Sequence, residues 1–381
     1  MAKKILFLTG TRADFGKLKS LMHALDADAE FKVHVFITGM HVLPKYGNTG
    51  DEVEKCGFSN TFKFINQKSN DSMDSILANT VQGLSNYIAL LKPDMLIIHG
   101  DRAEALAGAI VGAFNNILVG HIEGGEVSGT IDESIRHSIS KLAHLHFVAN
   151  DEAKQRLMRM GERENNIFII GSPDIDLMTS SELPTLESVK TRYEIPFERY
   201  SIFAFHPVTT SLHTLLANIR EIRTSLIDSG RQYVAIYPNN DPGSDIIIEE
   251  LESLRGNPHF RIFPSLRFEA FLVLLKHAEF MIGNSSAAIR EAPFYGVPSI
   301  NIGSRQHGRS SCDTIVHTAE SRNDILAAIE KIGSMKFVGS DHFGSGTSAC
   351  QFLDILKTDA VWSVTTQKQF VDHGMNHPDI C

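Results

Sequence analysis

Cysteine is scarce in this chain of 381 residues, which contains four. Cys56, Cys312, Cys350 and Cys381 lie far apart and form no C-x-x-C pair. This spacing argues against a disulfide framework and against a structural zinc site. None of the four stands in a context that activates a thiol, so we interpret them as packed or surface residues.

Basic residues are fewer than acidic ones in this chain. The chain has 36 lysines and arginines against 45 aspartates and glutamates, a formal net charge of −9. Such a protein does not attract polyanions over its whole surface, which argues against nucleic acid as a partner. A phosphate group would have to be held by a local cluster of cations and backbone amides.

Long apolar runs are absent as well. No run approaches the roughly 20 residues that span a bilayer, and residues 5–8 are too few for the core of a signal peptide. We therefore expect a cytoplasmic protein with no membrane partner. The sequence also has neither a G-x-G-x-x-G fingerprint nor an H-E-x-x-H spacing, so we expect no cofactor and no metal.

Apolar runs of strand length alternate with segments of helical periodicity, which is typical of parallel β-α-β units. The pattern occurs in both halves of the chain. The strands are expected at residues 5–9, 33–38, 95–98, 118–122, 145–148 and 167–170, and then at 202–205, 233–237, 261–263, 280–282, 299–302 and 314–317. Helices are expected between them, for example at residues 15–25, 104–114, 212–227 and 268–276.

Turn-forming residues separate the two halves at residues 180–184. We therefore predict an α/β protein with an N-terminal Rossmann-like domain at residues 1–180, which carries the carboxylates described below. A C-terminal Rossmann-like, nucleotide-binding domain follows at residues 181–358, and residues 359–381 form a tail segment. The length of the chain suits two domains that each bury a core.

Ligands of open parallel sheets bind at the carboxyl ends of the strands. The first expected strand runs into a glycine-containing turn, residues 9–17, which offers Arg12 and Lys17 where a helix begins. Backbone amides and two cations in this position suit a phosphate or a pyrophosphate. An ordinary capped turn with solvated side chains is the alternative.

Carboxylates follow the next expected strands. Asp101 comes after residues 95–98, and Glu123 lies at the end of residues 118–122. Asp132 and Arg136 are four residues apart, so they share one face of a helix. Asp132 alone could belong to a solvated helix start, but three carboxylates at neighbouring strand ends favour acid–base chemistry.

The second half places polar groups at equivalent points. His206 follows residues 202–205, and Ser285 and Ser286 follow residues 280–282. We expect a helix to begin at the two serines, where free amides would hold a diphosphate, and Glu291 two turns later to accept hydrogen bonds from ribose hydroxyls. His206 could instead be a core residue and Glu291 a surface one. Two Rossmann-like domains with ligand groups at facing strand ends describe the GT-B architecture, with a nucleotide-sugar in a central cleft.

Together these segments resemble the hydrolysing UDP-N-acetylglucosamine 2-epimerases of sialic acid biosynthesis, over nearly the whole chain. The motifs that carry the resemblance are residues 10–17, 99–102, 121–126, 132–137, 283–286 and 303–306. Non-hydrolysing bacterial 2-epimerases share the fold but resemble a Thr-Arg-Pro-Glu turn and a His-Val-Glu-Ala-Gly segment. This chain has Thr-Arg-Ala-Asp at residues 11–14 and His-Ile-Glu-Gly-Gly at residues 121–125, which favours the hydrolysing branch.

The resemblance implies that Asp101, Glu123 and Asp132 are the catalytic carboxylates and that His206 acts beside the diphosphate. It also implies a set of residues that bind the nucleotide-sugar, namely Arg12, Asp14, Lys17, Arg102, Arg136, His137, Asn239, Ser285, Ser286, Glu291, Arg305 and Arg309. The partner would be this small-molecule substrate, and the oligomer a homodimer or a homotetramer.

The implied reaction converts UDP-N-acetylglucosamine and water to N-acetylmannosamine and UDP. No carbonyl acidifies the C2–H bond, so anti elimination of UDP would give 2-acetamidoglucal, and water would then add across the double bond. The product would serve sialic acid biosynthesis and hence a capsule or surface polysaccharide. The sequence leaves open which carboxylate is the base. It also leaves open a UDP- or GDP-N,N'-diacetylbacillosamine 2-epimerase for legionaminic acid, a GT-B glycosyltransferase and a non-enzymatic nucleotide-sugar sensor.

Overall fold

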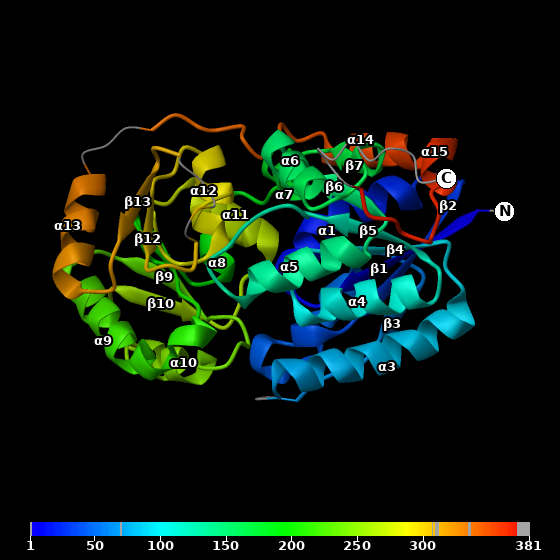
Figure 1. Cartoon of the computed structure of the whole chain (residues 1–381). Coiled ribbons are helices and arrows are strands. Elements are labelled where there is room, and N and C mark those ends of the chain that lie inside the picture. The colour runs from blue at the N-terminus through cyan, green and yellow to red at the C-terminus, as the bar shows by residue number, and fades with distance from the viewer. Residues whose placement is uncertain (1, 69–70, 307, 309–311, 334–336, 372–381) are drawn as a thin grey trace.

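Two α/β domains lie side by side in the computed structural model of the chain (Figure 1). The structure describes residues 2–68, 71–306, 308, 312–333 and 337–371, so Arg309 lies outside the described residues. Each domain is built around a sheet whose strands all pair in parallel, with helices packed on it. The predicted α/β class with two Rossmann-like domains is therefore confirmed.

The first domain, on the right of Figure 1, has a seven-stranded sheet in the order β3-β2-β1-β4-β5-β6-β7. Its strands are β1 Lys3–Thr9, β2 Phe31–Ile37, β3 Thr61–Lys63, β4 Met95–His99, β5 Leu118–Ile122, β6 Leu145–Val148 and β7 Ile167–Ile169. Its helices are α1 Arg12–Asp26, α2 Gly50–Lys55, α3 Met73–Leu91, α4 Ala103–Phe114, α5 Ile131–Leu142, α6 Asp151–Arg159 and α7 Pro173–Met178.

The second domain has a six-stranded sheet in the order β10-β9-β8-β11-β12-β13. Its strands are β8 Ser201–Ala204, β9 Tyr233–Ile236, β10 Phe260–Phe263, β11 Met281–Gly283, β12 Ser299–Ile302 and β13 Ile315–Thr318. Its helices are α8 Leu186–Arg192, α9 Leu212–Asp228, α10 Ser244–Glu252, α11 Phe268–Lys276, α12 Glu291–Phe294 and α13 Arg322–Ile332. Short 3₁₀ turns occur at Gly39–Val42, Pro44–Tyr46, Glu164–Asn166, Thr209–Ser211 and Ser286–Ala288.

The central strands are apolar on both faces because helices cover both sides of each sheet. In β1, Ile5 and Phe7 join the core beneath α1, whereas Leu6 and Leu8 join the core beneath α3, α4 and α5. This division follows from the alternation of side chains along a strand. It explains why the sequence shows a continuous apolar run at this point rather than an alternating one.

The chain returns to the first domain after the second is complete. Helices α14, Ser348–Leu356, and α15, Asp359–Trp362, lie at the right of Figure 1, and Phe352, Leu356 and Val361 are buried in the core beneath α1. The two domains are thus linked both after α7 and before α14.

Strand β3 was not predicted from the sequence. This strand has three residues at the edge of the sheet, and two of them are exposed. So short an element shows no period, and its pairing with β2 depends on tertiary contacts.

None of the helices in the described part of the chain is long and apolar enough to cross a membrane.

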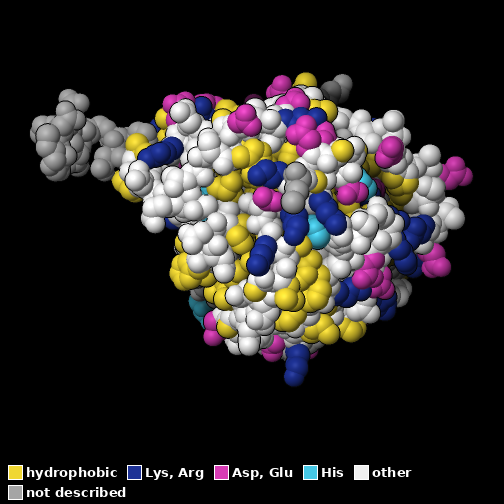
Figure 2. Space-filling model, turned by 90° about the vertical axis from the view of Figure 1, so that its right-hand side faces the viewer, with side chains coloured by type: hydrophobic (Ala, Val, Ile, Leu, Met, Phe, Trp, Pro, Cys, Tyr) yellow, Lys and Arg dark blue, Asp and Glu magenta, His cyan; other side chains and the backbone are white. Residues whose placement is uncertain are grey.

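The surface exposes large hydrophobic side chains at one end of the first domain. Leu90 near the end of α3 is 85% exposed and Phe114 at the end of α4 is 79% exposed. Figure 2, which faces this end of the molecule, shows hydrophobic side chains gathered on its lower part.

Candidate active site between the two domains

A cavity of about 280 Å³ lies between the carboxyl ends of the two sheets. Both domains line it. The predicted residues among its walls are Arg12, Asp14, Lys17, Asp101, Arg102, Glu123, Asp132, Arg136, His206, Asn239, Ser285, Ser286, Glu291 and Arg305. His137 is not among them, and its Nε2 lies 3.7 Å from Glu133 Oε1 on the same helix.

Sheet topology explains why these residues meet. In the first sheet the strand order reverses between β1 and β4, and in the second between β8 and β11. The loops after such neighbouring strands leave in opposite directions and open a crevice between them. The turn after β1 and the Asp101 turn after β4 therefore face the His206 segment after β8 and the Ser285 segment after β11.

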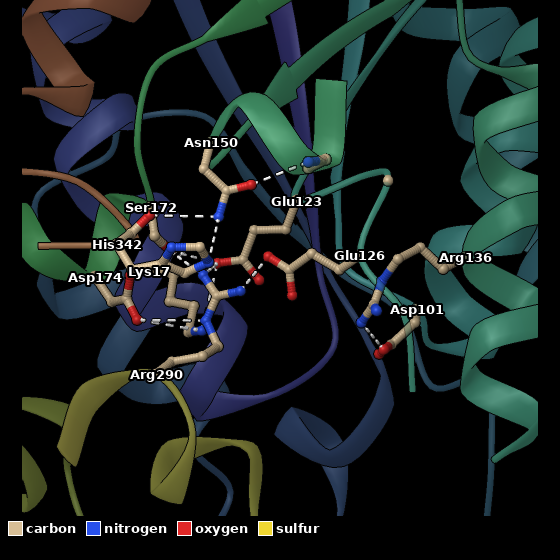
Figure 3. A network of polar contacts seen from close by, with 12 residues as sticks. Lys17, Asp101, Glu123, Glu126, Arg136, Asn150, Ser172, Asp174, Arg290 and His342 are labelled. Carbon is tan, nitrogen blue, oxygen red and sulfur yellow. Dashed lines mark hydrogen bonds and ion pairs between the residues drawn. The ribbon is translucent and has the colours of Figure 1, made fainter. Parts of the chain in front are cut away.

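Glu123 lies at the centre of a buried polar cluster (Figure 3). Its Oε1 accepts hydrogen bonds from Arg290 Nη2 at 2.6 Å and Ser172 Oγ at 2.7 Å, and it lies 3.4 Å from Lys17 Nζ. Its Oε2 lies 3.2 Å from His99 Nε2. Burial opposes the charge of Glu123, but Arg290, Lys17 and His99 outweigh burial and hold its pKa well below the ordinary value. Glu123 is therefore an ionised carboxylate.

The backbone of Glu123 is unusual too. Its φ of +63° lies in the left-handed region, which a glutamate rarely adopts. This conformation turns the chain sharply at the end of β5, and the surrounding hydrogen bonds must hold it there.

A second ion pair involves Asp101 and Arg136. The Arg136 guanidinium donates to Asp101 Oδ2, and Arg136 is almost fully buried on α5. In Figure 3 this pair stands apart from the Glu123 cluster, on the far side of Glu126. Asp132 and Arg136 are thus not paired with each other across the helix face that they were predicted to share. Each pairs with a residue outside the helix.

Asp132 has the opposite protonation tendency to Glu123. Its Oδ2 lies 3.1 Å from Arg305 Nη2 of the second domain. Burial raises the pKa of Asp132, and the negative charge of Asp101 adds to this effect, which Arg305 only partly offsets. Asp132 consequently holds a proton more readily than an ordinary aspartate does, and burial also raises the pKa of Glu291 in the same cavity.

His206 is held as a neutral ring. The backbone N–H of Asn239 donates to Nδ1 at 3.0 Å, so the proton of the ring lies on Nε2. The side chain of Asn284 accepts from the His206 N–H and donates to its carbonyl, which fixes the segment. Burial lowers the pKa of His206 well below its ordinary value, and the charges of Arg305 and Arg102 lower it further.

The expected helix at Ser285 and Ser286 is wrong in form. A single 3₁₀ turn, Ser286–Ala288, is followed by the four-residue helix α12, on which Glu291 is the first residue. Pro293 has no N–H to continue one helix through both pieces. A long helix dipole is therefore missing here, and the segment offers an anion its backbone amides and hydroxyl groups instead.

Three other predicted residues are already engaged by protein groups. Asp14 accepts from the N–H groups of Gly10 and Thr11 and closes the capping box of α1. Arg12 pairs with Glu52, and the Arg102 guanidinium donates to Asn240 across the cleft. Arg12 and Arg102 keep their charge beside the cavity, whereas the oxygens of Asp14 serve the turn.

Three residues of the buried cluster were not predicted from the sequence, namely Arg290, Ser172 and Asp174. Arg290 lies next to Glu291 in a segment that was singled out, but the expected helix gave no reason to direct it into the cleft. Ser172 lies in the connection after β7 and Asp174 in the first turn of α7, so the rule for strand ends could have found them. No three histidine, cysteine or acidic side chains in the described part of the chain are grouped as metal ligands.

Comparison with known proteins gives a consistent result. The family model described as UDP-N-acetylglucosamine 2-epimerase matches residues 23–357 of this chain. A UDP-N-acetylglucosamine 2-epimerase of Neisseria meningitidis serogroup B is 49% identical over 97% of this chain and 99% of the relative. A hydrolyzing UDP-N,N'-diacetylbacillosamine 2-epimerase of Legionella pneumophila is 32% identical over 94% of this chain and 96% of the relative.

Solved structures agree in fold. The crystal structure of the Methanocaldococcus jannaschii UDP-GlcNAc 2-epimerase in complex with UDP-GlcNAc and UDP has a TM-score of 0.80. It is 22% identical in sequence, and the match covers 93% of this chain and 99% of that chain. The predicted GT-B architecture is thereby confirmed.

We expect His206 to remain neutral, with its proton on Nε2, through the pH range in which an ordinary histidine titrates, because burial and two arginines disfavour the imidazolium. NMR of histidine labelled with ¹⁵N in the ring reports both the tautomer and the titration, and the His206→Asn variant assigns the signal. A ring that titrates near the ordinary value of 6.5 would contradict this assignment.

Proposed function

This chain belongs to the UDP-N-acetylglucosamine 2-epimerase family, and we propose that it is a hydrolysing member, which converts UDP-N-acetylglucosamine and water to N-acetylmannosamine and UDP. The observation that carries the proposal is a single cavity with two carboxyl groups whose pKa values are shifted in opposite directions, lowered at Glu123 and raised at Asp132. A reaction that removes a proton from one face of C2 and returns one to the other face needs this pair. The name of the Neisseria meningitidis relative supports the substrate.

The second domain holds the nucleotide. His206 Nε2–H, Arg305 and the Ser285–Ser286 segment surround the side of the cavity where a diphosphate would lie. A neutral histidine that donates a hydrogen bond, together with a fixed cation, binds the diphosphate more tightly as negative charge develops on the leaving UDP. Glu291 Oε2 is buried without a hydrogen-bond partner among the described residues, and it accepts a hydrogen bond from a ribose hydroxyl.

The first step is elimination. Departure of UDP gives C1 oxocarbenium character, which makes the C2 proton removable, and Glu123 accepts that proton. The products of this step are UDP, 2-acetamidoglucal and a protonated Glu123. Positioned acid–base catalysis of this kind contributes roughly 10²–10⁴-fold to the rate.

The second step is hydration of the double bond. Asp132 gives its proton to C2 on the face opposite to the one that lost it, and water adds to C1. Asp101, which forms an ion pair with Arg136, accepts a proton from the attacking water. N-acetylmannosamine results, and proton exchange with solvent returns Glu123, Asp132 and Asp101 to their starting states.

The acting unit is a homodimer or a homotetramer. Leu90 and Phe114, at the ends of the adjacent helices α3 and α4, are the most exposed large hydrophobic side chains of the first domain. A second copy of this chain would remove them from water.

The direct test is incubation of the purified protein with UDP-N-acetylglucosamine alone, followed by chromatography of nucleotide and sugar. We expect equal amounts of UDP and N-acetylmannosamine. Inertness toward this substrate, with release of a free sugar from UDP- or GDP-N,N'-diacetylbacillosamine, would assign the activity of the Legionella pneumophila relative instead. Sugar release only in the presence of an acceptor would indicate a transferase.

Replacement of each carboxylate by its amide should abolish turnover while the fold and UDP affinity persist. We expect Asp101→Asn, Glu123→Gln and Asp132→Asn each to lower kcat by at least about 10²-fold. UDP affinity from calorimetry and the melting temperature provide the two readouts of an intact site. Asp94→Asn, which removes a surface partner of Lys3, is the matched control, and near-normal kcat in all three variants would refute the assignment.

A further inference from the structure

We infer that Arg290 is a positioning residue, which reaches from the second domain to hold Glu123 ready as a base only when the two domains close on each other. This inference rests on the proposed function, because that proposal makes Glu123 the base. Arg290 itself acts neither as an acid nor as a base. It acts through the carboxylate that it contacts.

Arg290 crosses from one domain to the other at the most buried point of the cleft. It stands at the N-cap of α12 and is 1% exposed. One guanidinium nitrogen donates to Glu123 at 2.6 Å and also to Ser172, while the other donates to Glu126. The fork of an arginine suits two carboxylates at once, so it fixes both the distance and the orientation of Glu123.

Lys17 makes the reciprocal connection. It belongs to α1 of the first domain, and its Nζ lies 3.5 Å from Glu291 of the second domain. It also lies 3.4 Å from both Glu123 and Asp174. Each domain thus places one cation among the carboxylates of the other, and the two connections form together.

Closure changes the surroundings of Glu123. If the domains move apart, Arg290 leaves with α12, whereas Lys17 stays with the first domain. Glu123 would then lose its nearest cation, at 2.6 Å, and keep the more distant one, at 3.4 Å. A base that is complete only in the closed cleft does not act on a substrate that is still exposed to bulk water.

The segment that returns to the first domain covers this contact. The Arg290 guanidinium lies 4.7 Å from the centre of the Phe343 ring, and Phe343 is 8% exposed. An aromatic face stabilises a cation that has left water. Arg290 therefore contacts both domains and the segment that links them.

The charge of the cluster makes Arg290 decisive for Glu123. The titratable groups that face Glu123 are Arg290 and Glu291 on or beside α12, Lys17 on α1, His99 at the end of β4, Asp174 on α7, Glu126 in the β5–α5 loop and Arg136 on α5. This set holds three carboxylates and three lysine or arginine side chains, so without Arg290 the carboxylates would be in the majority. Removal of Arg290 would leave Glu123 beside like charges, and its proton affinity would rise.

The kinetic test compares Arg290→Met with Arg290→Lys. In Arg290→Met we expect the acidic limb of the kcat profile to move upward by about 1–2 pH units and kcat to fall by about 10- to 100-fold at pH values below that limb. Raising the pH should restore part of the loss, because Glu123 ionises again. Arg290→Lys keeps the charge and should recover part of both effects, while KM changes little in either variant.

The matched control is Lys19→Met, which removes another ion pair between the domains, Lys19 with Glu269 at 2.9 Å, without touching Glu123. We expect the pH profile and kcat of this variant to stay at the values of the unmodified chain. If the acidic limb of the kcat profile shifted upward in Lys19→Met as well, the shift would result from the loss of any ion pair between the domains. That outcome would overturn the inference. A uniform loss of kcat at every pH in Arg290→Met would overturn it as well.

A measurement without substrate separates this inference from the proposed function. NMR of protein that carries ¹³C in the glutamate side-chain carboxyls follows the titration of Glu123, which the Glu123→Gln variant assigns. We expect the Glu123 titration to move to higher pH in Arg290→Met, whether or not UDP-N-acetylglucosamine is turned over. An unchanged titration overturns the role of Arg290, whereas failure of turnover in the unmodified chain overturns the proposed function alone. If Arg290→Met does not fold, the double variant Arg290→Met/Glu126→Gln removes one charge of each sign and takes its place.

Discussion

The rest of the site depends on buried ion pairs between the two domains, to which each domain contributes one cationic side chain. Arg290 pairs with Glu123 and Glu126 of the other domain, and Lys17 pairs with Glu291. Away from water, opposite charges interact strongly, and a charge left without a partner is costly. The relation of the two domains in the structure lets these groups pair with one another. That relation also determines the width of the cleft and brings Asp132 to Arg305.

The same constraint explains how chemically similar carboxyl groups acquire different tasks. Glu123 is surrounded by donors, and its pKa is depressed although it is buried. Asp132 is buried with the negative charge of Asp101 nearby, Arg305 only partly offsets these effects, and its pKa is raised. In the proposed mechanism, the number and distance of the cations thus prepare a base and an acid in one cavity. His206, kept neutral with an Nε2 proton, would add a hydrogen-bond donor for the leaving diphosphate without adding a charge that competes for Glu123.

Sequence patterns predicted the components of the site because parallel sheets bring every carboxyl strand end to one edge. Asp101, Glu123 and His206 could be found from that rule, and Asp132 from its spacing to Arg136. The ion pairs across the cleft could not be found in this way. They depend on how the domains face each other, as in the pairs of Asp132 with Arg305 and of Glu123 with Arg290. Arg290 was overlooked for a local reason. A continuous helix was expected where the chain makes a 3₁₀ turn and a separate short helix, and this break places Arg290 at an N-cap rather than within a helix.

The most direct test of the central claim, that this cavity breaks the C2–H bond and the C1–O bond of the nucleotide-sugar, is a turnover in solvent enriched in both deuterium and ¹⁸O. NMR locates the deuterium in the sugar, and mass spectrometry locates ¹⁸O in the nucleotide. We expect deuterium at C2 of the released N-acetylmannosamine and no ¹⁸O in UDP, because elimination cleaves the C–O bond on the sugar side. Retention of the original proton at C2, or ¹⁸O in the β-phosphate of UDP, would contradict it.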